Sequence, residues 1–247
     1  LRDESSFALP QVDQAFRPMR EDGPTLRADD KWRRHNRTED RAVQRAASDL
    51  VEDLGRVTGI KHAYDFTARS IILVGTLGKN KTIDRLVAEG KLDTSGVRDQ
   101  WESYVLQIVK NPAPGEDEAL VIAGSDRRGT IYGMYELSEM IGVSPWYWWA
   151  DVTPRRRDQL ALHGDLKKQG PPAVKYRGIF LNDEDWGLRP WASKTFEPEA
   201  GNIGPKTYAK IFELLLRLRA NYIWPAMHEG TPAFNSFPTN KEIADAY

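Results

Sequence analysis

The sequence predicts an α/β protein. Short apolar strands alternate with amphipathic helices over residues 38–165, and the alternation starts again after residue 173. The chain has 247 residues, of which 40% are hydrophobic, so it can bury a substantial core. From this pattern we expect a lead-in over residues 1–37, an N-terminal α/β domain over 38–165 and the start of a second domain over 166–247.

The N-terminal domain begins with a helix that we expect over residues 38–58. Apolar residues recur there every three or four positions, and the acidic residues Glu39 and Asp40 stand in the expected first turn. Gly59 marks its end. Further along, the sequence predicts strands over residues 71–74 and 103–109 and a helix over 82–89.

The clearest unit of this domain spans residues 119–141. An apolar strand over 119–123 leads into the turn Gly124-Ser-Asp-Arg-Arg-Gly129, and a helix with one apolar face follows as far as Ile141. The two glycines permit a tight turn between strand and helix. We expect the basic and polar residues 155–172 to be the linker to the next domain.

After the linker the sequence predicts one βαβ unit. A strand over residues 174–181 is followed by a long loop, and Gly204-Pro205 then begins an amphipathic helix with proline at its first position. A second strand over 221–225 completes the unit, which within one sheet is parallel and right-handed. Because a parallel strand pair has open edges and uncovered faces, it cannot form a domain by itself. Residues 241–247 have the pattern of a further helix.

Composition and motifs exclude several classes of protein. The net charge is −1, with 35 basic and 36 acidic side chains, so we expect neither nucleic acid nor a membrane as a partner. The chain has no cysteine and four scattered histidines, and we expect no metal and no cofactor. Residues 75–82 are similar to a phosphate-binding loop but lack its Gly-Lys-Ser/Thr ending, which makes nucleotide binding a minor alternative.

An acidic cluster marks the candidate active site. Asp183, Glu184 and Asp185 follow directly on the strand predicted over 174–181, and polar residues at the carboxyl end of a parallel barrel strand usually belong to the active site. Glycoside hydrolysis needs paired carboxylates, one as acid for the leaving oxygen and the other as base for water or as nucleophile. The structural alternative is that Asp183 or Asp185 caps a turn and that Glu184 is solvated.

Aromatic residues gather near this cluster in the sequence. Six of the eight tryptophans lie between Trp146 and Trp224, and residues 146–149 are all aromatic. Flat rings with polar edges suit sugar rings, so a sugar-binding surface that includes Trp191 is one interpretation. The alternative is that rings of this run seal the junction between two domains.

Two cationic side chains are further candidates. Arg127, in the glycine-flanked turn, could pair with a substrate carboxylate or, equally, bridge to a neighbouring domain. His228 follows closely on the end of the strand predicted over 221–225, and it is the histidine whose position suits a site.

Three segments carry distinctive motifs. Residues 123–151 end Trp-Tyr-Trp-Trp-Ala-Asp, residues 174–185 are Val-Lys-Tyr-Arg-Gly-Ile-Phe-Leu-Asn-Asp-Glu-Asp, and residues 212–227 end Asn-Tyr-Ile-Trp-Pro-Ala-Met. In this order they resemble family 115 of the glycoside hydrolases, the xylan α-1,2-glucuronidases. The resemblance covers most of residues 38–247.

This resemblance implies a longer protein, in which an α/β domain like the N-terminal domain of hexosaminidases precedes a (β/α)8 TIM barrel. Members of the family release glucuronic acid or its 4-O-methyl ether from xylan with inversion, so two carboxylates would flank a water. On the family's pattern Asn182 and Asp183 match active-site pocket positions, and our catalytic candidates are Asp183 and Glu184. The expected substrate-binding residues are Asn182, Asp185, Trp146, Arg127, Glu136 or its neighbour Glu139, Trp224 and His228, the last in a place where we expect tryptophan in many relatives.

Only the first two of eight barrel strands are expected in this chain. We therefore expect the parent protein to be the glucuronidase and the chain alone to be an inactive fragment of it. The expected partner is glucuronoxylan or its oligosaccharides, and the full-length parent could form a homodimer.

We expect an extracellular, secreted protein, although the chain shows no signal peptide. Glycosylation triplets at Asn36 and Asn80 favour secretion only weakly. The alternatives are a non-catalytic carbohydrate-binding module and a barrel glycosidase acting on another uronic-acid or hexosamine glycoside.

Overall fold

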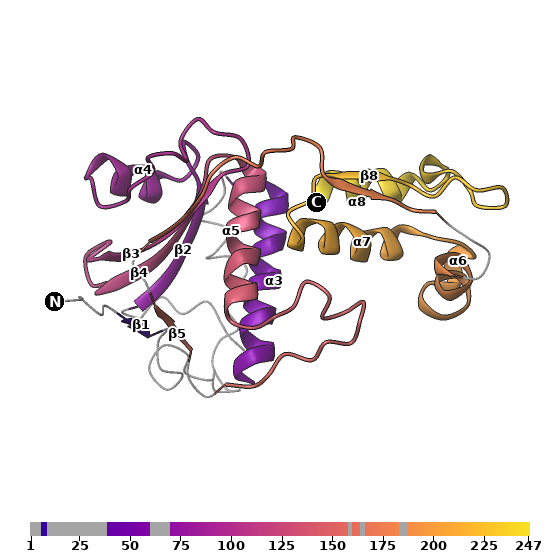
Figure 1. Ribbon diagram of the computed structural model, residues 1–247, viewed down its shortest axis with the longest axis horizontal. Helices are drawn as coiled ribbons and strands as arrows, with labels where there is room; N and C mark the ends of the chain where they lie inside the picture. The colour runs from indigo at the N-terminus through magenta and orange to yellow at the C-terminus, as the bar shows by residue number, and fades with distance from the viewer. Residues whose placement is uncertain (1–5, 9–38, 60–69, 158–159, 164–165, 183–186) are drawn as a thin grey trace, which may run out of the picture. The chain divides into compact units, whose positions relative to one another are not determined.

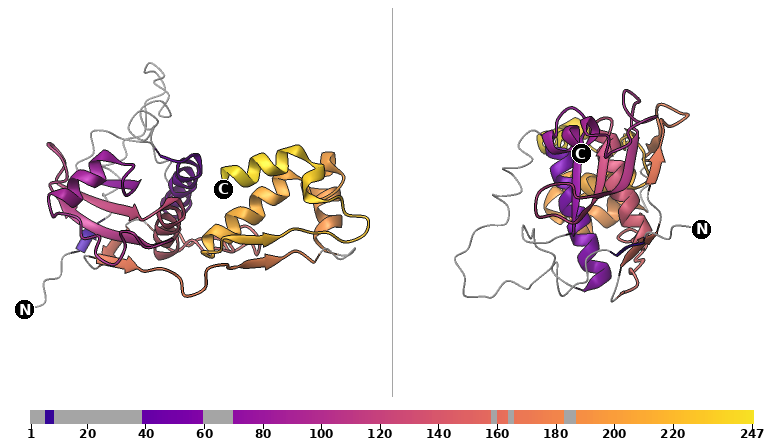
Figure 2. Two further views of the ribbon diagram at one scale, coloured as in Figure 1. Left: turned by 90° about the horizontal axis from the view of Figure 1, so that it is seen from above. Right: turned by 90° about the vertical axis from the view of Figure 1, so that its left-hand side faces the viewer.

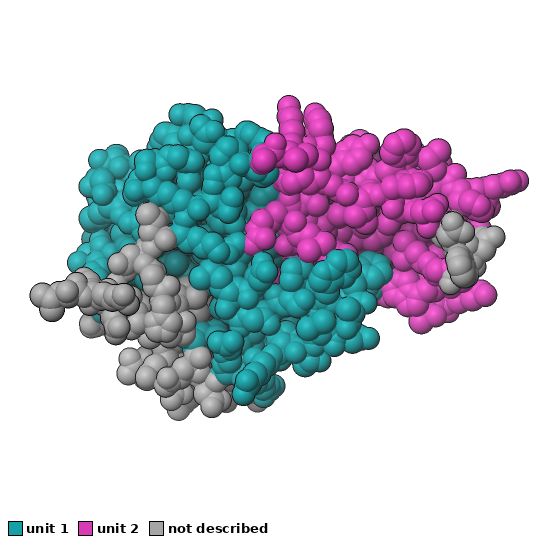
Figure 3. Space-filling model, viewed as in Figure 1, with its two compact units in different colours: residues 1–172 teal, residues 173–247 magenta. Residues whose placement is uncertain are grey.

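The computed structural model divides into two compact units, Leu1–Pro172 (unit 1) and Ala173–Tyr247 (unit 2) (Figure 3). Both contain helices and strands, so the predicted α/β class is confirmed (Figure 1). The structure describes residues 6–8, 39–59, 70–157, 160–163, 166–182 and 187–247.

Unit 1 is built on a sheet of four described strands in the order β2-β4-β3-β6. Strands β2 and β4 are parallel, whereas β3 runs antiparallel to both β4 and β6. Strand β4 lies between two neighbours and is buried from Ala119 onward, which explains its continuous apolar sequence. The strands are β2 (Ser70–Thr76), β3 (Tyr104–Lys110), β4 (Glu118–Gly124) and β6 (Leu166–Gln169).

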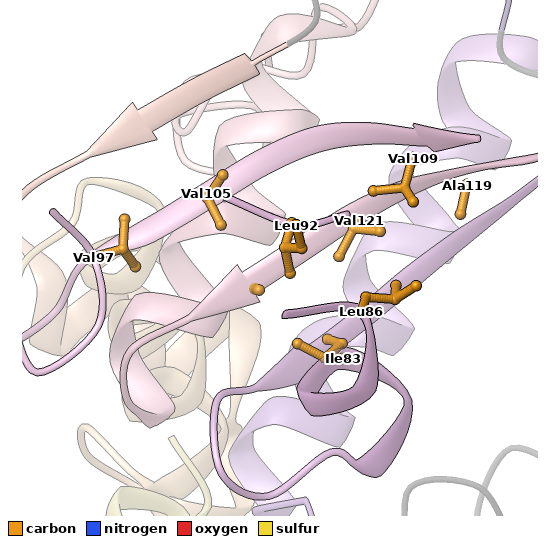
Figure 4. Packing of buried hydrophobic residues seen from close by; sticks show 9 residues of the cluster. Ile83, Leu86, Leu92, Val97, Val105, Val109, Ala119 and Val121 are labelled. Carbon is orange, nitrogen blue, oxygen red and sulfur yellow. The ribbon is translucent and has the colours of Figure 1, made fainter. Parts of the chain in front are cut away.

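Helices cover both faces of this sheet (Figure 2). Helices α3 (Arg41–Thr58) and α5 (Arg127–Met140) pack against each other on one face, and α4 (Lys81–Ala88) lies on the other. The two faces of β4 therefore meet different helices. Ile83 and Leu86 of α4 pack with Val121 (Figure 4), whereas a Cβ on Gly133 of α5 would lie 2.7 Å from the side chain of Ile122.

Helix α3 begins three residues later than the sequence predicts. Asp40 is its N-cap, and its carboxylate accepts the N–H of Ala42 at 2.9 Å. Glu39 consequently lies outside the first turn. Its carboxylate accepts the N–H of Thr76 at 2.7 Å and the Thr76 hydroxyl at 2.9 Å, which ties the start of α3 to the end of β2.

The turn between β4 and α5 is shorter than predicted. Helix α5 starts at Arg127, and the N-cap Asp126 accepts the N–H of Gly129 at 2.8 Å. Arg127 and Gly129 are thus helical. The glycine at position 124 serves close packing, because a Cβ there would collide with the backbone of Thr130.

The stretch predicted as a linker contains strands. Strand β6 pairs antiparallel with β3, and Lys168 of β6 binds Asp93 at 2.6 Å. Strand β5 (Ala161–His163) pairs with β1 (Ser6–Ala8), which lies within the expected lead-in. Strand β6 escapes the sequence prediction because Leu-Lys-Lys-Gln is mostly polar, as is common at a sheet edge.

Unit 2 contains the predicted βαβ unit. Strands β7 (Gly178–Phe180) and β8 (Tyr222–Trp224) are parallel, as predicted. Helix α7 (Pro205–Arg217) connects them, and Pro205 occupies its first position, as predicted. Helix α8 (Pro238–Ala246) packs against α7, and both helices lie on the same side of the strand pair (Figure 2).

The amino-terminal ends of β7 and β8 are held together by side chains. Arg177 donates from Nε to the carbonyl of Arg219 at 2.8 Å and from Nη1 to the carbonyl of Val174 at 2.9 Å. Asn221 accepts the N–H of Arg177 at 3.0 Å and donates to the carbonyl of Lys175 at 2.7 Å. Strand β7 is shorter than the predicted 174–181 because these carbonyls bind side chains and not a strand ladder.

The long loop predicted between β7 and α7 contains helical turns. Because each is at most five residues long, none shows a helical period in the sequence. They are α6 (Leu188–Trp191), the π-helix η1 (Ala192–Phe196) and the 3-10 helix η2 (Pro198–Ala200), and η3 (Phe234–Ser236) follows β8.

Candidate functional site

The candidate site lies at the carboxyl ends of β7 and β8, where parallel strands of α/β proteins place their active sites. The N–H of Leu181 donates to the carbonyl of Trp224 at 2.9 Å, so the ladder continues up to the residue before Asn182. Asn182 is exposed. The predicted Asp183, Glu184 and Asp185 lie outside the described residues.

Exposed aromatic rings line the strand pair. Tyr176 is 69% exposed, Phe180 53%, Tyr222 50% and Trp224 51%. The ring centroids of Phe180 and Trp224 lie 5.5 Å apart, and those of Tyr176 and Tyr222 lie 6.3 Å apart. Because alternate strand residues share a face, these rings occupy the face that α7 and α8 leave uncovered. Trp224 is the ring of this face at the carboxyl end of β8.

The loop after β7 is anchored by a buried carboxylate. Glu197 is 2% exposed and accepts the N–H groups of Lys206 and Thr207 and the Thr207 hydroxyl, each at 3.0 Å. The N-cap of α7, Gly204, has no side chain, so Glu197 supplies the cap and its negative charge meets the positive end of the helix. The loop is thereby fixed to the helix that follows it.

Two predicted site residues lie at the end of β8 and in the turn that follows it. The indole N–H of Trp224 points at the sulfur of Met227, 3.0 Å away. The carbonyl of His228 accepts the N–H of Thr231 at 2.9 Å, which closes a tight turn and leaves the His228 side chain exposed. Trp224, at the end of β8, and His228, in the turn after it, are therefore both exposed.

The two loops touch each other. Asn202, which is 8% exposed, donates from Nδ2 to the carbonyl of Gly230 at 3.4 Å. Arg189 lies against the same glycine, with Nη1 2.8 Å from the place where a Cβ would stand. Asn182, Trp224 and His228 thus lie at the carboxyl end of one strand pair, and the loops that follow its two strands contact each other.

Two of the predicted site residues of unit 1 lie at its surface. Trp146 is 46% exposed, in a turn where its backbone N–H donates to Ser144 Oγ at 3.1 Å. Arg127, in the first turn of α5, forms an ion pair with Asp40, the cap of α3, at 3.7 Å. The contact explains Arg127 structurally, and its role in substrate binding stays a prediction.

Glu136, also predicted as a site residue, is buried inside unit 1. It is 6% exposed, accepts the hydroxyl of Tyr104 at 2.8 Å and pairs with Lys167. This carboxylate joins α5 to β3 and β6, which is a structural contact. Its neighbour Glu139 is exposed. A substrate role for either residue stays a prediction.

Several of the described carboxyls have shifted pKa values. In unit 1, burial raises the pKa of Glu39 above its usual range, although the hydrogen bonds from Thr76 and the charge of Lys79 oppose the shift. In unit 2, the hydrogen bond from Lys206 lowers the pKa of Glu199, and Glu199 in turn raises the pKa of Lys206. Both partners of this surface pair are therefore charged at neutral pH.

The segment that is similar to a phosphate-binding loop is closed by its own side chains. Asn80 is 6% exposed and caps α4, accepting the N–H groups of Thr82 at 3.1 Å and Ile83 at 3.3 Å. Its amide group donates to the carbonyl of Val74 at 3.3 Å. Because Asn80 is buried, its amide is not accessible for glycosylation in the folded protein. Asn36, the other expected glycosylation position, lies outside the described residues.

The described ranges contain neither a metal-type cluster nor a membrane-spanning helix. Within them, no three histidine, aspartate or glutamate side chains gather as a metal site would require. No helix in the same ranges is long and apolar enough to cross a membrane.

Sequence reasoning missed Glu197, Asn202 and Arg189. One signal for Glu197 was present, because a helix that starts Gly204-Pro205 has no capping side chain of its own. The contacts of Asn202 and Arg189 with Gly230 join residues 28 or more positions apart, and no local pattern predicts them.

Comparisons with known proteins give the same assignment from sequence and from structure. Residues 169–247, which include all of unit 2, match the family model "Glycosyl hydrolase family 115". Among solved structures, the chain is similar to BtGH115A, described as a novel family GH115 4-O-methyl-α-glucuronidase with specificity for decorated arabinogalactans. The identity is 43% and the TM-score 0.73, over 85% of this chain and 26% of that one.

A structure of CpGH84D matches at 12% identity with a TM-score of 0.42, over 85% of this chain and 36% of that one, a likeness too slight to inform the fold. No curated protein matches. This chain spans about a quarter of the length of BtGH115A, and the similarity covers 85% of this chain. The family model over residues 169–247 and the 43% identity to BtGH115A together support the assignment of this chain as a fragment of a glycoside hydrolase family 115 protein.

Proposed function

We propose that this chain belongs to a glycoside hydrolase that releases glucuronic acid, or its 4-O-methyl ether, from a decorated polysaccharide with inversion. The observation that supports this most directly is the parallel β7–β8 pair within the family segment, with Asn182 and Trp224 at its carboxyl ends. The activity described for BtGH115A supports the same reaction. Since such polysaccharides lie outside cells, we expect the enzyme to be secreted.

Unit 1 would be the N-terminal domain, and unit 2 would be the first βαβ part of a (β/α)8 barrel. Two features support this arrangement: α7 and α8 lie on one side of the strand pair, and the other side is aromatic and exposed. In a closed barrel this other side would be the packed interior. Hydrolysis would then require the later strands, so the 247-residue chain alone would be inactive.

In this scheme Asp183 or Glu184 supplies one carboxylate of the catalytic pair, and a later barrel strand supplies the other. Inverting enzymes hold the two carboxyl groups about 6.5–9.5 Å apart, so that one protonates the leaving oxygen while the other activates a water. Asn182, Asp185, Trp224 and His228 would bind the sugar, with Trp146, Arg127 and Glu136 or Glu139 as the candidates in unit 1.

The test measures release of uronic acid from 4-O-methylglucuronoxylan and from a decorated arabinogalactan. The 247-residue chain is compared with a form extended through the rest of the gene, and NMR identifies the anomer formed first. We expect release by the extended form alone, with the β-anomer appearing first. Asp183→Asn should lower its turnover at least about a hundredfold, whereas Asp117→Asn, at an exposed position of unit 1, should not.

Each result has one meaning. No uronic acid from either polysaccharide would refute the proposed reaction, and the α-anomer first would refute inversion. Release by the short chain would refute the need for further strands. The preferred polysaccharide decides between xylan and arabinogalactan as the substrate.

A further inference from the structure

Gly230 joins the two loops at the carboxyl ends of β7 and β8. It lies inside the turn that the carbonyl of His228 and the N–H of Thr231 close, and its φ of +85° belongs to the left-handed region that favours glycine. A Cβ at this position would stand 2.8 Å from Nη1 of Arg189. A methyl group at this position would therefore meet the guanidinium where it now lies against the turn.

Asn202, near the other end of the β7–α7 loop, also contacts Gly230. Its Nδ2 donates to the carbonyl of Gly230, while its Oδ1 accepts the N–H of Ile203 at 2.9 Å. The end of this loop is fixed in turn, because Glu197 binds the first turn of α7. The turn 228–231 thus rests on a loop that is itself anchored to a helix.

Among the charged residues of the described part of this loop, Arg189 is the one placed against the turn after β8. Glu197 binds the start of α7, Glu199 pairs with Lys206, and Lys194 is exposed on η1. A guanidinium is planar and weakly hydrated, so it can lie flat against backbone, which an ammonium group does poorly.

We propose that Arg189 is a positioning residue, which together with Asn202 fixes the turn 228–231 and so determines where the imidazole of His228 meets the sugar. The inference rests on the proposed function, which places His228 in the sugar subsite. A binding group that is displaced loses part of its contact with the sugar, so a residue that sets this position affects substrate binding without touching the substrate.

The first test uses NMR of the 247-residue chain. Gly230→Ala places a methyl group against Arg189, whereas the matched control Gly201→Ala has a similar φ of +61° and nothing within 4 Å of the new Cβ. Both variants should lose similar thermal stability, because both strain the backbone. The ring resonances of His228, assigned with His228→Gln, should shift in Gly230→Ala and in Arg189→Ala, but not in Gly201→Ala or Lys194→Ala.

The second test uses kinetics of the extended form. Arg189→Ala should raise KM for the uronic-acid substrate about tenfold and change kcat little, as expected when a contact equally strong in ground and transition state is lost. Lys194→Ala, which removes a cation from the same loop, should leave KM unchanged. A structural role of Arg189 alone would lower stability without this split between KM and kcat.

The outcomes separate the two proposals. Unmoved His228 resonances in both Arg189→Ala and Gly230→Ala would overturn the positioning role, and so would shifted resonances with an unchanged KM. If the extended wild-type form released no uronic acid, the proposed function would fail, and the resonances alone would then decide whether Arg189 holds the turn.

Discussion

Replacing Glu197 with alanine should loosen the amino-terminal end of α7. The substitution removes the acceptor of two backbone N–H groups, those of Lys206 and Thr207, and of the Thr207 hydroxyl. Thr207 is fully buried, so its hydroxyl cannot turn to water without local opening. The N-cap Gly204 offers no substitute side chain.

The expected loss can be assembled from these contacts. Removing a helix cap costs about 1 kcal/mol, and removing a buried charge from the helix N-terminus costs about 1 kcal/mol more. Leaving a buried hydroxyl without an acceptor adds roughly 1–2 kcal/mol. Because these contributions overlap, we expect Glu197→Ala to lower the free energy of unfolding of unit 2 by about 3 kcal/mol. Glu197→Gln keeps one acceptor oxygen and should cost about 1–2 kcal/mol.

Hydrogen exchange measured by mass spectrometry on peptides from residues 205–217 reports on α7 specifically. The expected order of amide protection is wild type, then Glu197→Gln, then Glu197→Ala. Glu199→Ala is the matched control, because it removes a nearby carboxylate whose partner Lys206 is exposed. If Glu197→Ala exchanged no faster than Glu199→Ala, the assignment of Glu197 as the cap of α7 would be wrong.

Three further predictions concern other described contacts. Because the pKa of Glu39 is higher in the folded than in the unfolded protein, the carboxyl contributes its full stability below the unfolded-state value of 4.5. This contribution is lost as pH rises through the folded-state pKa. Glu39→Gln should therefore gain stability relative to wild type between pH 4 and pH 7.5 in urea denaturation, and a constant difference would contradict the shift. Glu136→Ala should lower the free energy of unfolding by about 2–3 kcal/mol. A double-mutant cycle with Tyr104→Phe should give a coupling energy of about 1–2 kcal/mol, and a value near zero would show that the hydrogen bond between Tyr104 and Glu136 contributes nothing to stability. Arg177→Lys should cost about 1–2 kcal/mol because an ammonium cannot reach the carbonyls together, and unchanged exchange protection of β7 would be evidence against that role.

The strands and helices with a strong period in sequence were predictable. Helix α3 shows apolar residues at helical spacing, and β4 is a continuous apolar run, because each buries one or both faces against neighbours close in the fold. The elements that escaped prediction lack such a signal. Strand β6 is held by its pairing with β3, about sixty residues away, and the turns between β7 and α7 are too short to show a period.

The placement of Asn182, Trp224 and His228 at the carboxyl ends of one strand pair could be predicted from the sequence, but the contacts that hold the neighbouring loops could not. A polar run directly after an apolar strand indicates the carboxyl end of that strand, and the parallel pairing of β7 with β8 then places Trp224 and His228 in the neighbouring position. The burial of Glu136 was not visible, because a charged residue on a helix gives no sign of which partners fold around it. The contacts of Gly230 depend on two loops meeting in space, which sequence spacing does not encode.

The burial of Asn80 has a practical consequence for making this protein. A host with an N-glycosylation pathway can attach a glycan to the triplet Asn80-Lys81-Thr82 on the nascent chain, before α4 has formed. A glycan on Nδ2 would then displace the bond to Val74 and force the cap of α4 out of the interior. Material from a bacterial host should fold, whereas material from yeast or insect cells should be either unmodified at Asn80 or retained and degraded during its passage through the secretory pathway.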